Sequence, residues 1–451
     1  MIKWKPGDKI ALLDCGFPHA EIVKPIGEGG QGTVYEVKLG GQSFALKWYH
    51  AGKLKNKNAF YKNLKANIED PERSMADCPN SLWPKYLTKE ENGSFGYVMD
   101  LRPKEYTDFP ALLNAKDKNG NRVAFKETDT MILAAMNLAK AFRELHRKGL
   151  SYQDLNDGNF FINMKTGDVL ICDNDNVTPD GEMNSGGVGG KPGYMAPEIV
   201  CGKAKPSERT DCYSLAVVLF KLFFRDNPLQ GKEFERLPCI TEAREHELFG
   251  TKPVFIYDPD DDSNRPVQGV HINVINLWPR FPQFFRDAFI RSFTVGMKNP
   301  QERRIENEWL KILVHLRDEW TITCPSCGRG IVFNEQVIGK TMTCKGCNSS
   351  LSYPKILHVN DCSVPLFPGK KLYAWHTAAK SDDYSTVTGE VVTNKNNPAL
   401  WGIKNLSGQA WKLKTPDGTE KEVPADGGVP IGDGISIEFN GTSGAVGEAK
   451  N

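Results

Sequence analysis

The sequence LSYQDLNDGNFFINMKTGDVLICDND, residues 150–175, places three oxygen-rich side chains in one short loop and hairpin. Two apolar runs, FFI and VLI, flank a KTGD turn, so the pattern predicts a β-hairpin. Asp154 precedes the first strand, Asn159 ends the loop, and Asp173 follows the second strand. Such carboxylate and amide oxygens can take up one proton and hold Mg²⁺, as phosphoryl transfer requires. The alternative is that the three side chains only cap turns.

A glycine-rich turn lies nearer the N-terminus, in residues 27–34, GEGGQGTV. It runs into a strand-like TVYEV pattern, whereas a dinucleotide-binding turn would open a helix. Residues without side chains let backbone N–H groups approach phosphates. Lys47 follows on the next predicted strand, within FALKWY; standing alone it would be interpreted as a solvated strand residue.

Taken in order, these motifs resemble those of the eukaryotic-type protein kinase superfamily. Residues 152–154, YQD, stand where that family has His-Arg-Asp, and residues 173–175, DND, replace Asp-Phe-Gly. The run YMAPE, which ends at Glu198, is similar to the family's Ala-Pro-Glu motif. In the family that glutamate pairs with an arginine, which here is Arg303. The resemblance implies an α+β fold of the bilobal protein-kinase type.

The resemblance also implies a role for each of these residues. Asp154 would accept the proton of a substrate hydroxyl, and Lys47 would contact the α- and β-phosphates of ATP. Asn159 and Asp173 would hold Mg²⁺ or Mn²⁺. The implied nucleotide site consists of the glycine-rich loop, the strands after it and the hinge between the lobes: Gly27, Glu28, Gly29, Gly30, Gln31, Gly32, Val34, Ala45, Lys47, Met99, Asp100 and Leu101.

Helical patterns surround these motifs. Residues 53–69 carry apolar side chains at helical spacing and predict a surface helix. In the family this helix supplies a glutamate for the lysine; here Glu69, at the end of the helix, is its only acidic residue, so the partner of Lys47 stays open. Residues 128–148 predict an amphipathic helix that leads into the catalytic loop, and Asp211 is expected to cap a buried helix.

Several residues depart from the family pattern. Gln153 replaces the arginine that in many kinases contacts a phosphorylated activation loop, and this loop offers little to phosphorylate apart from Thr178 and Ser185. Switching by loop phosphorylation is therefore not expected. Asn156 replaces the lysine that usually neutralises the transferred phosphate. Our hypothesis is that Lys191 supplies this charge as a catalytic residue; the alternative is a solvated loop lysine.

The residues after Asp173 differ as well. Asn174 takes the place of the phenylalanine that packs against the regulatory helix, so an inactive flip driven by that ring is not expected. Asp175 is either a further metal ligand or the residue that closes an Asx turn, and the turn is the favoured interpretation.

Four cysteines form two Cys-x-x-Cys pairs with the spacing of a Cys₄ zinc ribbon: Cys324, Cys327, Cys344 and Cys347. Four thiolates around Zn²⁺ would replace the core that so short a segment cannot build, so we expect a closed, structural site. A redox role for the pairs is the alternative. The other seven of the eleven cysteines are scattered and are expected to be reduced.

From residue 357 onward, short strand-like runs alternate with turn signals and predict a β-sandwich. The runs around Trp401 and Trp411 resemble forkhead-associated (FHA) domains, which bind phosphothreonine. We find no clear pair of an arginine and a Ser-x-x-His run of the kind such domains use. A docking module that binds without phosphate is therefore the alternative.

These patterns predict four consecutive parts: a kinase N-lobe at 1–101, a kinase C-lobe at 102–320, a zinc ribbon at 321–356 and an FHA-like β-sandwich at 357–447. With 57 basic and 56 acidic residues the net charge is +1, which favours neither nucleic acid nor an anionic membrane as a partner. No apolar run approaches the roughly 18 residues of a membrane span, and the N-terminus leads into no secretory core. We therefore expect a soluble, cytoplasmic protein.

As a whole, the sequence predicts an ATP- and Mg²⁺-dependent protein serine/threonine kinase. One alternative is a pseudokinase that binds nucleotide and scaffolds partners; another is a kinase of small molecules, against which the YMAPE run and Asp211 argue. The order of kinase, zinc ribbon and FHA-like module resembles bacterial kinases encoded with TerY-type von Willebrand proteins and a PP2C phosphatase in tellurite-resistance systems. That resemblance implies a TerY-like protein substrate and an opposing phosphatase as partners.

Overall fold

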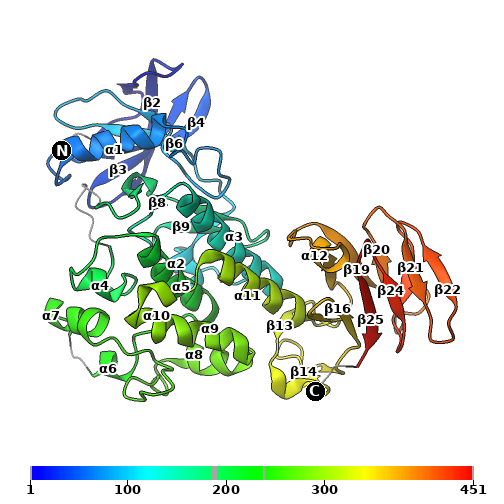
Figure 1. Cartoon of the computed structure of the whole chain (residues 1–451). Coiled ribbons are helices and arrows are strands. Elements are labelled where there is room, and N and C mark those ends of the chain that lie inside the picture. The colour runs from blue at the N-terminus through cyan, green and yellow to red at the C-terminus, as the bar shows by residue number, and fades with distance from the viewer. Residues whose placement is uncertain (1–2, 184–189, 237–238, 449–451) are drawn as a thin grey trace. The chain divides into compact units, whose positions relative to one another are not determined.

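A computed structural model describes residues 3–183, 190–236 and 239–448 (Figure 1). The chain forms two compact units, each assembled from several stretches of sequence. The first comprises Met1–Ala124, Asn137–Val274 and Phe289–Trp309, and the second Phe125–Met136, Ile275–Ala288 and Leu310–Asn451. The division of the sequence into four consecutive parts remains a prediction. The structure confirms mixed helix and strand content in the kinase-like region and β-sheets at the C-terminal end.

The first unit contains a six-stranded antiparallel sheet in the order β1-β2-β3-β4-β6-β5. Its strands are β1 (Lys9–Ala11), β2 (His19–Glu28), β3 (Gly32–Leu39), β4 (Gln42–Tyr49), β5 (Tyr86–Leu87) and β6 (Gly96–Asp100). Side chains alternate across β4: Leu46 and Trp48 enter the apolar core on one face, and Ala45 and Tyr49 enter the core on the other. Lys47 therefore shares the face of Ala45 and Tyr49.

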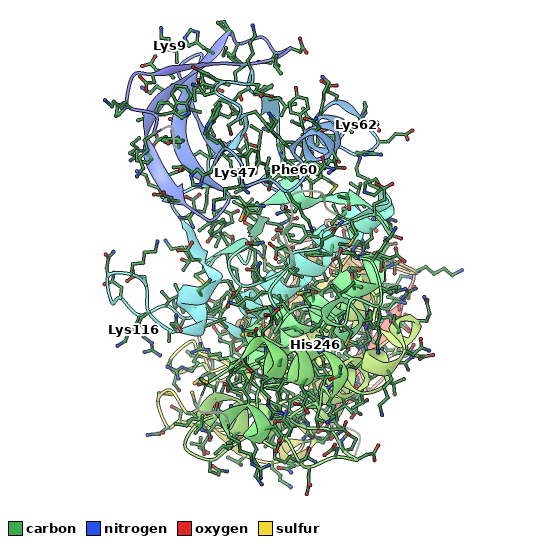
Figure 2. The ribbon with its side chains drawn as sticks, turned by 90° about the vertical axis from the view of Figure 1, so that its left-hand side faces the viewer. Lys9, Lys47, Phe60, Lys62, Lys116 and His246 are labelled. Carbon is green, nitrogen blue, oxygen red and sulfur yellow. The ribbon has the colours of Figure 1, made fainter. Side chains whose placement is uncertain are left out.

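Helix α1 (Lys57–Glu69) packs on that second face, where the sequence predicts a helix. Phe60 and Leu64 are buried in the core beside Tyr49, whereas Lys62 is exposed. Figure 2 shows Lys47 on the sheet and Phe60 on the side of helix α1 that faces it. The helix is thus a close neighbour of the strand that carries the lysine.

The predicted hairpin follows the catalytic-loop sequence, with Phe160 opposite Ile171. The strands of this region, grouped by sheet, are β10 (Val169–Ile171), β9 (Phe160–Asn163) and β7 (Tyr106–Asp108), and β11 (Thr178–Pro179) with β8 (Leu150–Ser151). Helix α3 (Thr128–Arg147) leads directly into this region and matches the predicted helix.

Helix α5 (Glu208–Phe224) is almost entirely buried and forms the centre of the first unit. Our expectation that Asp211 caps this helix is wrong. Ser207 is the N-cap, and its backbone N–H donates to Thr210 Oγ1 at 2.8 Å. Asp211 lies within the first turn instead, which leaves its carboxylate available to other partners.

Further helices complete the two units: α2 (Phe109–Leu113), α4 (Pro197–Val200), α6 (Lys232–Glu235), α7 (Glu242–His246), α8 (Ile272–Leu277), α9 (Gln283–Phe293), α10 (Val295–Lys298), α11 (Glu306–Glu319) and α12 (Ala374–Thr377). Single helical turns of other types are η1 (Asn174–Asn176), η2 (Glu247–Thr251), η3 (Trp278–Arg280), η4 (Pro300–Glu302) and η5 (Glu335–Val337). Among the described residues, none of the helices combines the length and apolar character that crossing a bilayer requires.

The second unit contains the paired cysteines, which lie on two short hairpins. The hairpins are β12 (Thr321–Thr323) with β13 (Gly330–Val332), and β14 (Met342–Thr343) with β15 (Ser350–Leu351). Cys324 and Cys344 are buried in a small apolar core with Phe333, and Phe367 from the β17–β18 connection and Trp401 of β20 pack in the same core. The cysteine hairpins therefore pack against the sheets that follow them.

The C-terminal residues form a six-stranded sheet in the order β17-β16-β25-β24-β21-β22 and a four-stranded sheet in the order β18-β19-β20-β23. The strands are β16 (Ile356–Val359), β17 (Cys362–Pro365), β18 (Lys371–Tyr373), β19 (Val387–Thr393), β20 (Trp401–Asn405), β21 (Trp411–Lys414), β22 (Glu420–Val423), β23 (Gly428–Pro430), β24 (Ser436–Glu438) and β25 (Ser443–Gly447). Leu357 from the first sheet, Ile403 from the second and Trp411 belong to one shared apolar core.

Buried charges join the end of α11 to these sheets. The ammonium group of Lys370 donates to the backbone oxygens of Arg317 at 2.6 Å and Thr321 at 3.1 Å. Arg317 pairs with Asp318 at 2.6 Å, and Trp375 Nε1 donates to the same carboxylate at 2.9 Å. Because a buried charge without partners is costly, these contacts fix the helix end against the sheets.

Candidate active site

Lys47 and two aspartates meet where strand β4 approaches the end of the hairpin. The ammonium nitrogen of Lys47 lies 3.2 Å from Asp173 Oδ1 and 2.9 Å from Asp175 Oδ2. Burial alone would lower the pKa of Lys47, but the charges of Asp175 and Asp173 outweigh burial and raise that pKa above its ordinary value. Lys47 is therefore a fixed cation at the end of β10.

Asp173 has a left-handed backbone conformation, with φ 54° and ψ 35°, directly before the turn η1. Such a conformation costs about 1–3 kcal/mol in a residue other than glycine and is concentrated at functional sites. The Asp173 side chain is 38% exposed, whereas that of Asp175 is fully buried. Of the two carboxylates, Asp173 is the one that can reach a bound metal ion.

Two asparagines hold the catalytic loop around Asp154. Asn159 Nδ2 donates to the backbone oxygen of Asp154 at 2.8 Å, and Asn156 Nδ2 donates to its Oδ1 at 3.1 Å. Cys172 N donates to Asn159 O at 2.9 Å, which joins the loop to the hairpin one residue before Asp173. The structure thus brings Asp154, Asn159 and Asp173 together.

The environment of Asp154 changes its acidity. Burial raises the pKa of Asp154, its hydrogen bond from Asn156 opposes this, and the charge of Asp173 adds to the increase, giving a pKa of about 6. A carboxyl group with this pKa is mostly ionised at neutral pH. It can therefore accept a proton from a hydroxyl group.

The glycine-rich residues form the end of β2, the turn at 29–31 and the start of β3. Gly29 N donates to Gly32 O at 2.9 Å, and His50 N donates to Gln31 O at 2.7 Å. A Cβ at Gly32 would lie 2.4 Å from the backbone oxygen of Trp48, so only glycine fits this position. Residues 27–30 are exposed, which leaves their backbone accessible to a phosphate group.

Apolar side chains lie beside Lys47 on the same face of the sheet. Ala45 and Met99 are cross-strand partners on β4 and β6, and both are buried. Val34 and Leu170 belong to the same apolar cluster. An apolar surface next to a cation suits a nucleotide, whose base is flat and whose phosphates are charged.

The hinge residues follow at the end of β6. Asp100 is the last residue of the strand, and its carboxylate pairs with Lys85 at 2.7 Å. Leu101 comes next and packs against the same apolar cluster. The Asp100 carboxylate is thus paired with Lys85, and the side chain of Leu101 continues the apolar surface of Met99.

Asp211 of α5 holds the backbone of the catalytic loop through its carboxylate. Its carboxylate accepts hydrogen bonds from Tyr152 N at 2.6 Å and Gln153 N at 3.2 Å. Gln153 has a positive φ of 72°, so these bonds hold a strained backbone in place. The Tyr152 hydroxyl donates to the backbone oxygen of Cys172 and connects the loop to the hairpin a second time.

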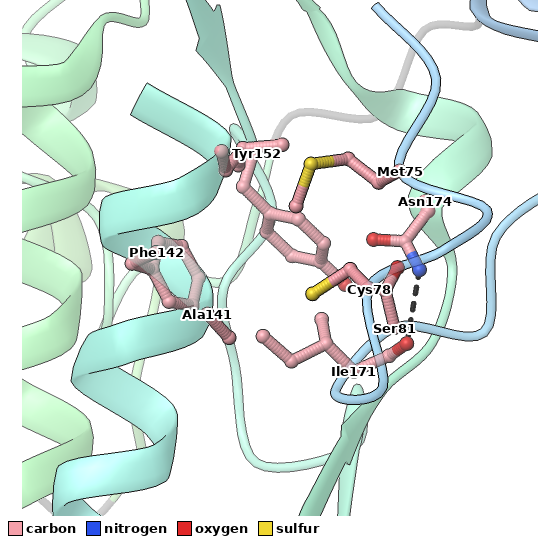
Figure 3. Close-up of a pocket in the computed structure, with 9 residues that line it drawn as sticks. Met75, Cys78, Ser81, Ala141, Phe142, Tyr152, Ile171 and Asn174 are labelled. Carbon is pink, nitrogen blue, oxygen red and sulfur yellow. Dashed lines mark hydrogen bonds between the residues drawn. The ribbon is translucent and has the colours of Figure 1, made fainter. Parts of the chain in front are cut away.

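Asn174 anchors the turn that follows Asp173. Its Nδ2 donates to Leu82 O at 3.0 Å and Ile171 O at 2.9 Å. It also lines a cavity of about 10 Å³, room for one water molecule at most, together with Phe142 and Tyr152 (Figure 3). The position that the family resemblance gives to a phenylalanine is therefore occupied by a hydrogen-bonded amide.

The interpretation of Asp175 as an Asx-turn residue is wrong. Its carboxylate accepts hydrogen bonds from the Lys47 ammonium group and from the Tyr49 hydroxyl, not from the turn backbone. The reason is a tertiary contact, because η1 directs this side chain toward Lys47 and Tyr49 on β4.

Lys191 lies next to the catalytic loop. Its ammonium nitrogen is 3.0 Å from Asp157 Oδ1, and the partly buried Lys221 approaches the other oxygen of Asp157 at 3.4 Å. Two lysines therefore face one carboxylate, which leaves excess positive charge beside the loop. The Lys191 side chain is 56% exposed.

The two candidate phosphorylation sites are Thr178 and Ser185. Thr178 is buried, and its hydroxyl donates to Glu182 O at 3.1 Å. Ser185 lies outside the described residues.

The pair of a glutamate and an arginine that the resemblance implies is confirmed, because Glu198 and Arg303 form two hydrogen bonds of 2.7 and 2.8 Å.

Comparison with known proteins agrees with this geometry. Residues 20–246 match the model of the protein kinase domain family. The chain is 28% identical over 210 residues to eukaryotic translation initiation factor 2-alpha kinase 3 of Bos taurus, covering 42% of this chain and 18% of that protein. It is 25% identical over 229 residues to serine/threonine-protein kinase AtPK2/AtPK19 of Arabidopsis thaliana, covering 48% and 44%. It is 25% identical over 257 residues to serine/threonine-protein kinase ArnS of Sulfolobus acidocaldarius, covering 50% and 39%.

The family match covers half of the chain, and the chain belongs to the protein kinase family. It spans less than half the length of each of these three relatives. Family membership implies ATP and Mg²⁺, and the residues present fit both. Asp173 offers an accessible carboxylate, and Asn159 uses its Nδ2 toward Asp154, so its side-chain oxygen would be the atom to hold a metal ion.

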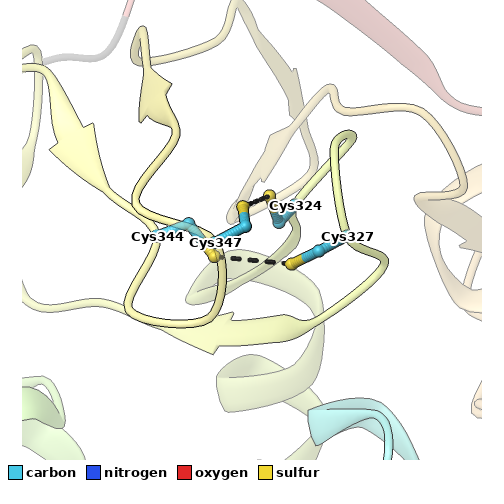
Figure 4. A group of neighbouring side chains, drawn as sticks. All are labelled: Cys324, Cys327, Cys344 and Cys347. Carbon is cyan, nitrogen blue, oxygen red and sulfur yellow. Dashed lines mark hydrogen bonds between the residues drawn. The ribbon is translucent and has the colours of Figure 1, made fainter.

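The four cysteines also fit a metal ion. Their sulfur atoms all lie within 4.8 Å of one another, and Cys324–Cys347 and Cys327–Cys344 are each 3.7 Å apart (Figure 4). Four thiolates bound tetrahedrally to Zn²⁺ are separated by about 3.8 Å, because each Zn–S bond is about 2.3 Å long. The spacing matches a zinc site and differs from a disulfide.

Sequence reasoning missed several residues that shape this site. The sequence shows Asn156 only as the replacement of a lysine, whereas in the structure it holds the Asp154 carboxylate. Tyr152 stands at the histidine position of the family motif, and in the structure it links the loop to the hairpin. The counterion role of Asp175 was missed because it depends on contacts with β4. A sequence signal existed only for Asp175, as a second aspartate beside an expected metal ligand.

Proposed function

We propose that the chain is an ATP- and Mg²⁺-dependent protein serine/threonine kinase. The observation that carries the proposal is one connected set of contacts. Lys47 contacts Asp173 at 3.2 Å, the neighbouring Cys172 bonds to Asn159 at 2.9 Å, and Asn159 bonds to Asp154 at 2.8 Å. Phosphoryl transfer needs a phosphate-binding cation, metal ligands and a base within one such site.

Each residue then has a chemical task. The glycine-rich loop covers the phosphates, Lys47 orients them, and the surface of Ala45 and Met99 receives the adenine. ATP and Mg²⁺ supply the phosphoryl group and neutralise its charge. Asp154 orients the acceptor hydroxyl and takes its proton, and the hydrogen bond from Asn156 keeps its carboxylate in place.

The missing lysine of the catalytic loop requires another cation in this proposal. Lys191 is suited to that task, since it lies beside the loop, is exposed and shares Asp157 with Lys221. Lys191→Ala should lower turnover by about tenfold or more while ATP affinity stays unchanged. Lys203→Ala, on an exposed loop of the same unit, is the matched control. Unchanged turnover in Lys191→Ala would exclude the assignment.

Serine or threonine is the proposed acceptor residue, because two of the relatives named above carry serine/threonine-protein kinase as their names. A second candidate function is a nucleotide-binding scaffold without transfer. It is favoured by the asparagines at positions 156 and 174, where the family resemblance leads us to expect lysine and phenylalanine.

Radiolabelled transfer from ATP decides between the two functions. The wild type and Asp173→Ala are incubated with Mg²⁺ or Mn²⁺, with the protein itself and a cell lysate as acceptors. Incorporation that is lost in the variant supports the kinase and gives the masses of its substrates. A wild type that binds ATP but transfers nothing supports the scaffold.

A structural zinc ion at the four cysteines is part of the proposal. Two of the four sulfur atoms are buried in the apolar core of the second unit, and none of the eleven cysteines forms a disulfide bond. Cysteines without disulfide bonds also agree with a reducing, cytoplasmic location. A metal at this place would stabilise the hairpins and take no part in the transfer.

For the C-terminal sheets we propose a docking role toward protein partners. The sequence contains no arginine after Arg329, and bidentate recognition of a phosphate favours arginine. We therefore favour docking without phosphate over the phosphothreonine binding of FHA domains. The proposed setting, a bacterial tellurite-resistance system with a TerY-like substrate and a PP2C phosphatase, rests on the order of these parts in the sequence. Co-purification of such partners with the full chain tests it.

A further inference from the structure

The carboxylate of Asp175 is fully buried, although the proposed transfer step gives it no task. Its Oδ2 lies 2.9 Å from the ammonium nitrogen of Lys47 and accepts a hydrogen bond from the Tyr49 hydroxyl at 2.5 Å. Its Oδ1 lies 3.2 Å from the same nitrogen. A buried carboxylate is stable only when a cation and hydrogen bonds compensate its charge. Both kinds of partner come from strand β4.

Helix α1 does not provide an alternative counterion for Lys47. Its only acidic residue is Glu69, which lies at the end of the helix and pairs with Lys65. The helix instead reaches the segment after Asp175 through neutral amides. Asn63 Nδ2 and Asn67 Nδ2 both donate to Val177 O, at 2.8 and 2.9 Å. The helix supports this segment, but it contributes no charge to the lysine.

The two aspartates are also separated by their exposure. Asp173 is 38% exposed and its carboxylate would be accessible to a metal ion, whereas the side chain of Asp175 is fully buried in the protein. Metal binding would draw the Asp173 carboxylate toward the ion, because the ion carries the larger local charge. Asp175 would then remain as the permanent partner of Lys47. The turn η1, anchored by Asn174, keeps it in this position.

We propose that Asp175 is the positioning residue that holds Lys47 in place for the nucleotide phosphates. It takes the task that the family resemblance assigns to a glutamate of helix α1. The inference rests on the proposed function, since it assigns Lys47 to phosphate binding. The inference also changes which element is expected to control the position of Lys47. The ion pair joins Lys47 to the turn after Asp173, and helix α1 acts on it only through the neutral hydrogen bonds of Asn63 and Asn67 to Val177 O.

The test compares binding of ATP and adenosine to the full chain. Asp175→Asn keeps the size of the side chain and removes its charge; Asp168→Asn, exposed in the β9–β10 turn, is the control. We expect the dissociation constant of Mg²⁺-ATP to rise about tenfold in Asp175→Asn, with adenosine binding within twofold of wild type. Adenosine has no phosphates, so a displaced Lys47 should not affect its binding. A general loss of structure would instead weaken the binding of both ligands.

Tyr49→Phe provides a milder second variant, because it removes one hydrogen bond and keeps the ion pair. Its expected effect is a two- to fivefold weaker affinity for ATP alone. Equal weakening of ATP and adenosine, or unchanged ATP affinity in both variants, would overturn the inference. A wild type that binds ATP without transferring phosphate would refute the proposed function and leave this comparison valid. A wild type that binds no ATP would refute both.

Discussion

His146 and Asp211 form a buried ion pair behind the catalytic loop, with 3.2 Å between His146 Nε2 and Asp211 Oδ2. The other ring nitrogen of His146 lies 2.8 Å from Glu306 Oε1. The same Asp211 carboxylate accepts the backbone hydrogen bonds of Tyr152 and Gln153. One histidine thus connects α3, α5 and α11 to the loop that carries Asp154.

The first prediction concerns the pH dependence of stability. Burial lowers the pKa of His146, but its hydrogen bonds to Asp211 and Glu306 outweigh burial and raise the pKa to about 10. Because the folded pKa lies above the unfolded value of about 6.5, the stabilisation is fully present below pH 6.5. It is lost progressively as the pH rises toward 10.

Denaturant unfolding between pH 6.5 and 9.5 measures this effect. His146→Gln should lower the free energy of unfolding by about 3–5 kcal/mol near pH 6.5, since two buried carboxylates lose their cation. The difference from wild type should shrink toward pH 9.5. His246→Gln, on the exposed surface of α7 (Figure 2), is the control and should follow the wild type. A difference that stays constant with pH would contradict the assignment.

The second prediction concerns Arg303. Its guanidinium forms two hydrogen bonds to Glu198 and donates to Gly296 O at 2.8 Å from a buried position. A lysine cannot reproduce this geometry, so Arg303→Lys should cost about 2–4 kcal/mol of stability and lower activity through the segment at Glu198. Arg304→Lys, whose pair with Glu308 is partly exposed, should cost less than about 1 kcal/mol. Equal effects of the two substitutions in unfolding experiments would refute the prediction.

The third prediction concerns zinc. Purified protein should contain one Zn²⁺ per chain by elemental analysis, and Cys344→Ser should lose it. Since Cys344 lies in the apolar core of the second unit, this variant or a strong chelator should lower the melting temperature of that unit. Cys239→Ser, an exposed cysteine outside the cluster, should retain the metal. Wild-type protein that is free of zinc and melts unchanged with chelator would argue for the redox alternative.

Local patterns predicted the elements that carry the site. The hairpin at 160–171 follows from its turn residues, and the helix at 128–147 from its apolar spacing. The glycine-rich turn and Lys47 were recognisable because their spacing is set by two adjacent strands. The sequence does not determine the start of α5, because both Ser207 and Asp211 are good N-caps and only the packing of the helix decides between them.

Contacts between distant parts of the chain were not predictable in the same way. Asp175 and Lys47 are 128 residues apart, and their ion pair arises from the direction of η1. The partners of His146 lie 65 and 160 residues away along the chain. Residue type and spacing show which groups can carry charge. They do not show which of these groups are buried together.

The most direct test of the proposed transfer is a comparison of the wild type with Asp154→Asn. Both proteins are loaded with Mg²⁺ and radiolabelled ATP, and nucleotide binding and phosphate incorporation are measured on the same samples, with Asp168→Asn as the control. We predict that Asp154→Asn binds ATP like the wild type while incorporation falls by at least about 100-fold, because only the proton acceptor is lost. Incorporation that persists in Asp154→Asn, or a wild type that binds ATP and transfers none, would contradict the account.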